Sequence, residues 1–136
     1  MIVLDCNAAL AMARGTMEGD AFRSLMLRGE EAIAPRFFSV ELANALWKMV
    51  RAGMMTEDEA GDSLKAATNL VSDFCPDDDL VVEAFSEAVR LNHPVYDMLY
   101  FVLARRNAAT LFTLDRKLQQ LCLDNGVDCV LTDTNF

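Results

Sequence analysis

Short apolar runs alternate with longer stretches of helical periodicity along this 136-residue chain. Strands that alternate with helices build a mostly parallel sheet, because each crossover helix returns the chain to the same edge of that sheet. We therefore expect an α/β fold with helices flanking a central sheet, as a single domain over residues 1–136. The expected strands are 2–4, 32–34, 70–74, 110–113 and 128–131.

The helices are predicted from apolar stripes at helical spacing and from their end signals. Thr56 followed by Glu59 is a capping-box pattern that marks one helix start. The segment 96–107 is apolar almost all round, which predicts a helix buried in the core. The expected helices are 8–14, 18–28, 37–52, 56–68, 77–91, 96–107 and 115–125.

Neither a membrane segment nor a secretion signal is visible in the sequence. No apolar run approaches the roughly 18 residues that would cross a bilayer. The segment Met1–Asp5 carries no basic residue, so it does not resemble a signal peptide, and we expect a cytoplasmic protein with no membrane association. The four cysteines form no C-x-x-C pair and there is one histidine. This pattern favours reduced thiols over structural zinc.

The net charge of −9 argues against a protein that grips nucleic acid by bulk electrostatics. The charge is unevenly distributed, however. Residues 54–93 contain ten acidic and two basic residues, which accounts for almost the whole imbalance. The other segments are close to neutral, so they remain able to face a polyanion.

Four acids occupy positions that a purely structural sequence would seldom use. Asp5 ends the first strand, and Asp115 follows the strand at 110–113. Asp97 opens the buried helix, and Glu41 is the only acid in the helix at 37–52. The working crevice of an open parallel sheet lies at the carboxyl ends of its strands. We therefore expect these four carboxylates to lie around one pocket.

Four converging carboxylates repel one another, and burial raises the pKa of each. A divalent cation relieves this repulsion. An all-oxygen ligand set suits Mg²⁺ or Mn²⁺ and does not suit zinc. A cation held in this way is able to activate water for attack on a phosphodiester.

The sequence around these acids resembles a known family. The relevant segments are 3–10 (VLDCNAAL), 40–46 (VELANAL), 95–104 (VYDMLYFVLA) and 111–118 (LFTLDRKL). In this order and spacing they resemble a PIN domain and, more narrowly, the VapC toxins of prokaryotic toxin–antitoxin pairs. The resemblance covers nearly the whole chain, although no single segment is specific.

This resemblance implies an endoribonuclease that depends on Mg²⁺ or Mn²⁺ and cleaves RNA. It implies metal binding by Asp5, Glu41, Asp97 and Asp115, with Asn7 and Thr113 in supporting polar positions. Asn7 stands where the family often has Thr or Ser, and its amide is able to donate a hydrogen bond to Asp5. The resemblance also implies a cognate antitoxin and a homodimer. Bases near these acids in sequence are the candidate RNA contacts: Arg36, Lys48, Arg51, Arg116 and Lys117.

Simpler roles exist for the same residues. Asp5, Asp97 and Asp115 each suit the N-cap of the helix that follows. His93, next to Pro94, suits a loop, and Cys6 suits the core. Three alternative functions also remain open: a PIN fold that binds without cutting, a receiver domain, and a phosphatase of the haloacid-dehalogenase kind. The phosphatase would require D-x-D after the first strand, where position 7 is Asn.

Overall fold

A four-stranded parallel sheet forms the centre of the computed structural model, which describes residues 1–132. Ile2 in the first strand pairs with Ala32 on one side and with Thr110 on the other. Because every pair is parallel, the carboxyl ends of all four strands lie at one edge of the sheet, as the sequence predicts. The strands, in the spatial order β3-β2-β1-β4, are β1 (Ile2–Leu4), β2 (Ala32–Pro35), β3 (Asp73–Cys75) and β4 (Thr110–Phe112).

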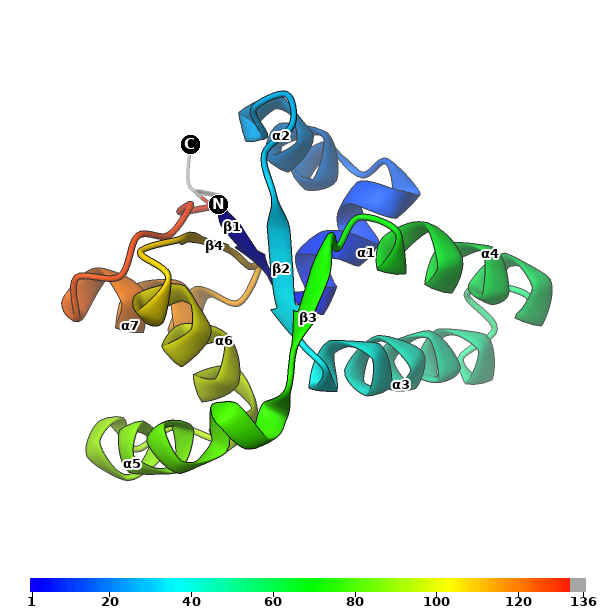
Figure 1. Cartoon of the computed structure of the whole chain (residues 1–136). Helices are drawn as coiled ribbons and strands as arrows, with labels where there is room; N and C mark the ends of the chain where they lie inside the picture. Colours follow the sequence, from blue (N-terminus) through cyan, green and yellow to red (C-terminus); the bar gives the residue numbers. More distant parts are fainter. Residues whose placement is uncertain (133–136) are drawn as a thin grey trace.

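Helices cover both faces of this sheet, with α1 to α4 on one side and α5 to α7 on the other (Figure 1). The mostly parallel sheet flanked by helices is therefore confirmed. The helices are α1 (Cys6–Arg14), α2 (Met17–Leu25), α3 (Phe37–Arg51), α4 (Glu57–Thr68), α5 (Val81–Leu91), α6 (Val95–Arg106) and α7 (Arg116–Asp124), with a short 3₁₀ helix η1 (Asp77–Asp79) before α5.

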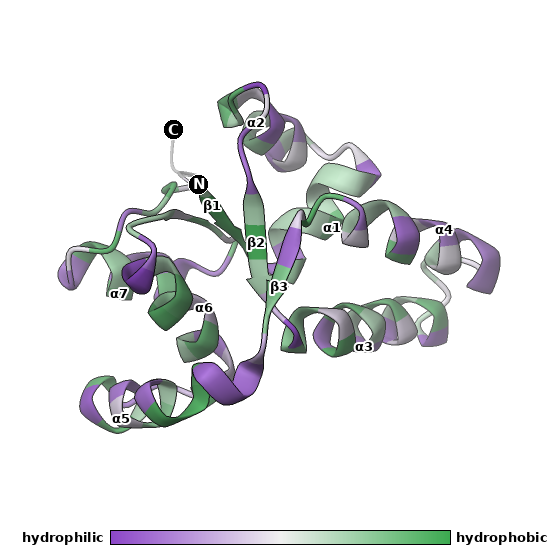
Figure 2. Cartoon of the chain, viewed as in Figure 1, coloured by the Kyte–Doolittle hydropathy of each residue, from purple (hydrophilic) through white to green (hydrophobic). Residues whose placement is uncertain are grey.

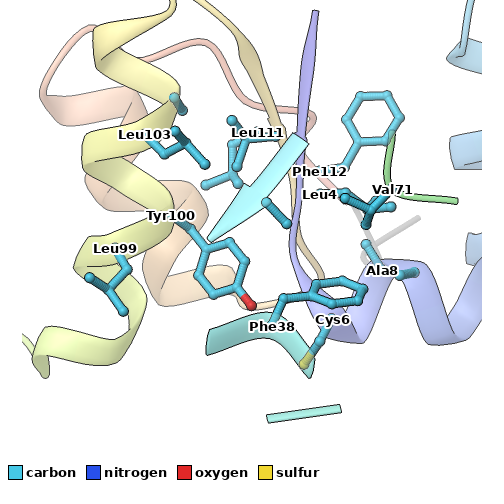
Figure 3. Close-up of a cluster of buried hydrophobic side chains, with 14 of the residues drawn as sticks. Leu4, Cys6, Ala8, Phe38, Val71, Leu99, Tyr100, Leu103, Leu111 and Phe112 are labelled. Atoms are coloured by element: carbon cyan, nitrogen blue, oxygen red, sulfur yellow. The ribbon is translucent and has the colours of Figure 1, made fainter. Parts of the chain in front are cut away.

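The most deeply buried helix is α6, and every residue from Met98 to Ala104 is buried. It packs against β1, β2 and β4, as the apolar composition of its sequence predicts. Figure 3 shows Tyr100 and Leu103 of this helix directed toward the sheet. The hydropathy colouring agrees, because β1 and the inner face of α6 are hydrophobic whereas η1 is hydrophilic (Figure 2).

The helices α3 and α4 form a hairpin that extends away from the sheet (Figure 1). Gly53 lies between them at φ +72°, a left-handed conformation that favours glycine. The side chain of Thr56 accepts the backbone N–H of Glu59 at 3.1 Å, so the predicted cap is present. A short apolar groove lies between the two helices of the hairpin, lined in part by Leu46, Trp47 and Leu64.

Strand β3 begins three residues later than the sequence indicated. The N–H groups of Leu70 and Val71 donate to Ala67 and Thr68 at the end of α4. Because these donors still belong to the helix end, they are not available for pairing in the sheet, and the strand begins at Asp73.

Two predicted helices are also shorter than expected. The helix predicted to reach residue 28 ends at Leu25, because the side chain of Glu30 accepts the N–H of Leu27 and closes a turn there. The helix predicted from residue 77 divides into η1 and α5. The N–H of Leu80 bonds to the carbonyl three residues earlier, which is the 3₁₀ pattern.

The fifth predicted strand, at 128–131, is reduced to a single parallel bridge. Leu111 of β4 donates to the carbonyl of Asp128 and accepts from the N–H of Val130. One residue pair does not make a regular strand, so the prediction was correct in place but too long. In residues 1–132, no helix has the length and apolar character needed to cross a membrane.

Candidate metal centre

The four acids singled out from the sequence come from four different elements and approach one another at the carboxyl edge of the sheet. Asp5 follows β1 directly, and its N–H donates to the carbonyl of Phe112 at the end of β4. Asp115 lies three residues beyond that strand and is the N-cap of α7. Asp97 lies in the first turn of α6, and Glu41 lies in the second turn of α3.

Asp5 is the most buried of these acids, with 4% of its surface exposed. Burial, together with the nearby charges of Glu41 and Asp97, raises the pKa of its carboxyl group to about 7. The hydroxyl of Thr113 donates to Oδ2 of Asp5 at 2.7 Å, which opposes the rise in pKa. Asp5 occupies the N-cap position of α1, but its side chain makes no capping bond. The simpler explanation of Asp5 as a helix cap is therefore wrong.

Asn7 is connected to the site through Thr113 and forms no hydrogen bond with Asp5. Its amide nitrogen lies 3.4 Å from the Thr113 hydroxyl, and its Oδ1 accepts the N–H of Leu114 at 3.0 Å. Thr113 also accepts the N–H of Asp115 at 3.1 Å. These bonds join the turn after β4 to the start of α1, so they fix Asp5 and Asp115 relative to each other. The expected direct bond from Asn7 to Asp5 is replaced by this longer connection.

Glu41 receives two protein donors on a single oxygen atom. The hydroxyl of Tyr100 donates to Oε1 at 2.9 Å, and the thiol of Cys6 donates to the same atom at 3.0 Å. Ligand atoms of Asp5, Cys6 and Glu41 all lie within 4.8 Å of one another. Figure 3 shows the oxygen of Tyr100 and the sulfur of Cys6 at the same end of the cluster. Cys6 is buried as expected, but it is also part of the site.

Asp97 is paired with His93, whose Nε2 lies 2.7 Å from Oδ2 of Asp97. Burial raises the pKa of Asp97, the bond to His93 lowers it, and the nearby charge of Asp115 raises it again. Asn92, the residue after α5, has a left-handed conformation, and the chain then places His93 against Asp97 of α6. His93 lies in a loop, as its sequence position predicts, but its contact with Asp97 was not predicted. Its spacing of four residues from Asp97 was the available signal.

Pro94 is the N-cap of α6, so the alternative in which Asp97 caps that helix is wrong. Asp115 caps α7, as the simpler role predicts, and it also lies close to Asp97. Its Oδ1 accepts the N–H groups of Lys117 and Leu118 at 2.9 and 3.2 Å, and its charge still acts on Asp97.

The donor set of this cluster fits a hard divalent cation. Protein donors hold one oxygen of each acid, namely Oδ2 of Asp5, Oε1 of Glu41, Oδ2 of Asp97 and Oδ1 of Asp115. Within residues 1–132 no Lys or Arg forms an ion pair with any of the four. Carboxylates gathered without cationic partners are typical of a Mg²⁺ or Mn²⁺ site.

The candidate RNA contacts lie at different distances from this cluster. Arg36 is the N-cap residue of α3, and Arg116 and Lys117 form the first turn of α7 beside Asp115. Lys48 and Arg51 lie in the last turn of α3, about 10 and 15 Å along the helix from Glu41. All five side chains are exposed.

Comparisons with known proteins show the family to which the chain is similar. The sequence profile of the PIN domain matches residues 2–123. Ribonuclease VapC3 of Pyrobaculum aerophilum is 27% identical over 124 residues, which are 88% of this chain and 92% of that protein. Ribonuclease VapC12 of Mycobacterium tuberculosis is 32% identical over 123 residues, which are 88% of this chain and 91% of that protein.

Two solved structures share the fold. The crystal structure of PAE2754 from Pyrobaculum aerophilum superposes with a TM-score of 0.71 at 24% identity, covering 88% of this chain and 84% of that one. The structure of VapBC-1 from nontypeable Haemophilus influenzae gives a TM-score of 0.64 at 18% identity, covering 96% of this chain and 97% of that one.

Proposed function

Because this chain belongs to the PIN domain family and resembles VapC proteins over most of its length, we propose that it is a metal-dependent endoribonuclease, the toxin of a toxin–antitoxin pair. The observation that carries this proposal is the meeting of Asp5, Glu41, Asp97 and Asp115 at one edge of the sheet. Their mutual approach gathers negative charge that a divalent cation would neutralise. The ribonucleases VapC3 and VapC12 supply the reaction class.

The four acids would hold Mg²⁺ or Mn²⁺, with Asn7 and Thr113 in support. When bound, the cation supplies a water of lowered pKa and neutralises charge on the phosphodiester. The residues of the chain keep the ligands in place. Thr113 orients Asp5, His93 orients Asp97, and the first turn of α7 holds Asp115. The raised pKa of Asp5 means that cation binding near neutral pH displaces a proton from this group.

We propose that RNA approaches from the side of Arg116, Lys117 and Arg36, which flank the cluster and form no ion pair with an acidic side chain within residues 1–132. Lys48 and Arg51 would reach only a longer substrate that extends along α3. In contrast, Arg105 and Arg106 form ion pairs with Glu83, so they are less available to contact RNA. Contacts of this kind position the phosphate backbone without reading its sequence.

The proposed antitoxin would dock in the groove between α3 and α4. This groove is mainly apolar, and the Trp47 side chain in it is 54% exposed. Groove binding of an apolar helix face is a common mode of peptide recognition. An antitoxin segment there would lie along the same helix that carries Glu41, which gives it a direct route to the cluster.

A homodimer would use a different surface, the outer face of α5. Val82, Phe85 and Val89 are 80%, 62% and 69% exposed, and they lie along one face of the helix. An apolar stripe on one helix is able to pack against its own copy across a two-fold axis. We further propose that residues 1–136 act as one domain and that the protein acts in the cytoplasm.

A cleavage assay tests the proposal. We expect the purified protein to cut an end-labelled RNA with Mg²⁺ or Mn²⁺ and to stop when EDTA is added. Asp97→Asn and Asp5→Asn should reduce the rate by more than about 100-fold, since even residues behind the ligands are worth 10–100-fold. Asp124→Asn, a matched change at an exposed acid in α7, should leave the rate unchanged.

The same assay separates the alternatives. RNA binding without cleavage under all metal conditions would support a silent binding module. Hydrolysis of a small phosphate ester without cleavage of RNA would support a phosphatase and contradict the proposal.

A further inference from the structure

The hydroxyl of Tyr100 is a polar group on a buried side chain whose ring lies in the apolar core. The residue is fully buried, and its neighbours in α6 from Met98 to Ala104 are buried with it. Burying a hydroxyl without a hydrogen bond costs free energy, so its partner is informative. That partner is Oε1 of Glu41, at 2.9 Å and 59 residues away in sequence.

Phenylalanine would fill the same space without this requirement. The ring of Tyr100 already packs within the apolar cluster shown in Figure 3, and the hydroxyl adds only the contact with Glu41. The presence of tyrosine therefore points to a role for the hydroxyl in the site.

Cys6 supplies a second donor to the same oxygen atom, at 3.0 Å. The two donors come from α1 and α6, whereas Glu41 belongs to α3, so Oε1 is fixed between three helices. Both the thiol and the phenol donate to this one oxygen atom.

We propose that Tyr100 is a positioning residue that, together with Cys6, holds Oε1 of Glu41 so that Oε2 is presented to the metal. This inference rests on the proposed function of the site. A half-buried glutamate has several rotamers, and two donors on one oxygen restrict them before the cation arrives. Groups behind the ligands of a metal site typically contribute 10–100-fold to its affinity.

The decisive experiment compares the two tyrosines of the chain. Tyr100→Phe removes the hydroxyl that contacts Glu41. Tyr96→Phe removes the other hydroxyl, one turn earlier on α6 on a side chain that is 60% exposed. We expect isothermal titration with Mn²⁺, without RNA, to give about 10-fold or weaker affinity for Tyr100→Phe. The affinity of Tyr96→Phe should equal that of the wild type.

Changes at Cys6 provide an independent test that does not depend on the folding of Tyr100→Phe. Cys6→Ser keeps a donor and should keep most of the Mn²⁺ affinity, whereas Cys6→Ala should weaken it. Because both donors share one oxygen, the double variant of Cys6→Ala and Tyr100→Phe should lose more affinity than the two single changes combined.

The outcomes separate this inference from the proposed function. A wild type that neither binds Mn²⁺ nor cuts RNA would overturn the proposed function. A wild type that does both, with unchanged Mn²⁺ affinity in Tyr100→Phe and in Cys6→Ala, would overturn the positioning role alone. A lower melting temperature without weaker Mn²⁺ binding would likewise assign Tyr100 to packing.

Discussion

Two groups of acids in this molecule have opposite electrostatic surroundings. In the first, the carboxylates of Asp5 and Asp97 are partly or fully buried near other acids, and their pKa values are raised. In the second, Glu83 and Glu87 on α5 pair with arginines of α5 and α6, and their pKa values are lowered. Acidic composition alone thus does not identify a metal site. Asp5 and Asp97 form no ion pair with Lys or Arg within residues 1–132 and have raised pKa values, which is the pattern of a candidate functional site.

The arginine-paired group has a structural role. Arg105 and Arg106 at the end of α6 reach Glu83, and Arg105 also reaches Glu87. Arg106 donates in addition to the carbonyl of Asp79 in η1. These bonds attach α5 and η1 to the buried helix, and they neutralise part of the acidic stretch at 54–93.

Neutralising one acid in each group should change stability with opposite signs. We expect the largest effect from Asp5→Asn, which should raise the free energy of unfolding of the metal-free protein at pH 7.5 by up to a few kcal/mol. The reason is that the folded state pays no desolvation cost for an uncharged amide. Chemical denaturation of both proteins in EDTA measures this difference. Equal or lower stability of the variant would mean that Asp5 is structural.

The pH dependence of the metal-free protein should follow from the same group. The carboxyl of Asp5 has a pKa of about 7 in the folded state and 3.8 as its ordinary value, so the folded state binds more protons between these limits. Its contribution to stability is complete below about pH 4 and is lost as the pH rises through about 7. Unfolding curves from pH 5 to pH 8 should show this decline in the wild type, and a flatter profile in Asp5→Asn.

Binding of a metal ion should restore the folding stability that repulsion among the clustered acids removes. A cation that binds only the folded state at 100 times its dissociation constant adds about 2.7 kcal/mol to the free energy of unfolding. We therefore expect Mn²⁺ to raise the melting temperature of the wild type, and EDTA to reverse the increase. Asp97→Asn should show much less of it, whereas Glu87→Gln should respond as the wild type does. An equal response from Asp97→Asn would place the metal elsewhere.

The arginine-paired group should respond weakly and in the other direction. Glu83→Gln removes two ion pairs that are about one third exposed, so we expect a loss of less than about 1 kcal/mol. The lowered pKa of Glu83 means that its contribution is present above its ordinary value of 4.5 and is lost in acid. Thermal melts of this variant at pH 7.5 and pH 3.5 test both statements. A loss that grew in acid would contradict the assignment.

The smallest expected effect concerns RNA. Lys117→Ala, beside Asp115, should weaken binding to all RNAs alike and reduce the salt dependence by roughly one unit of slope or less. Lys65→Ala on α4, within the acidic stretch, is the matched control and should leave the slope unchanged. Binding is best measured in an Asp97→Asn background, where cleavage does not interfere. A change in slope from Lys65 alone would place the RNA on the opposite face.

The sequence by itself was sufficient for the order of strands and helices and for the position of three acids. Asp5 and Asp115 follow strands, and Asp97 opens a helix, so their placement near the sheet edge depends mainly on chain order. Alternating short apolar runs specify a parallel sheet, and its carboxyl edge then follows from topology. Glu41 was identified because it is the single acid in an otherwise apolar and basic helix.

The ends of helices and strands were harder to predict from the sequence, because they depend on competition for backbone hydrogen bonds. Leu70 and Val71 suit a strand by composition, yet their N–H groups donate to carbonyl groups at the end of α4. The segment 128–131 has strand composition but finds one residue of β4 to pair with. Local sequence does not decide which of two available partners a donor will bind.

Only the tertiary structure decided which donors hold the acids. Tyr100, Cys6 and Glu41 lie on three helices, and they meet because those helices pack at particular angles around the sheet. Apolar periodicity marks Tyr100 and Cys6 as core residues, and it contains no signal for the direction of a hydroxyl or a thiol. The chain order therefore determined where charge gathers. The packing of helices determined which oxygen of each acid accepts a hydrogen bond, because bonds between distant residues form only where side chains converge in space.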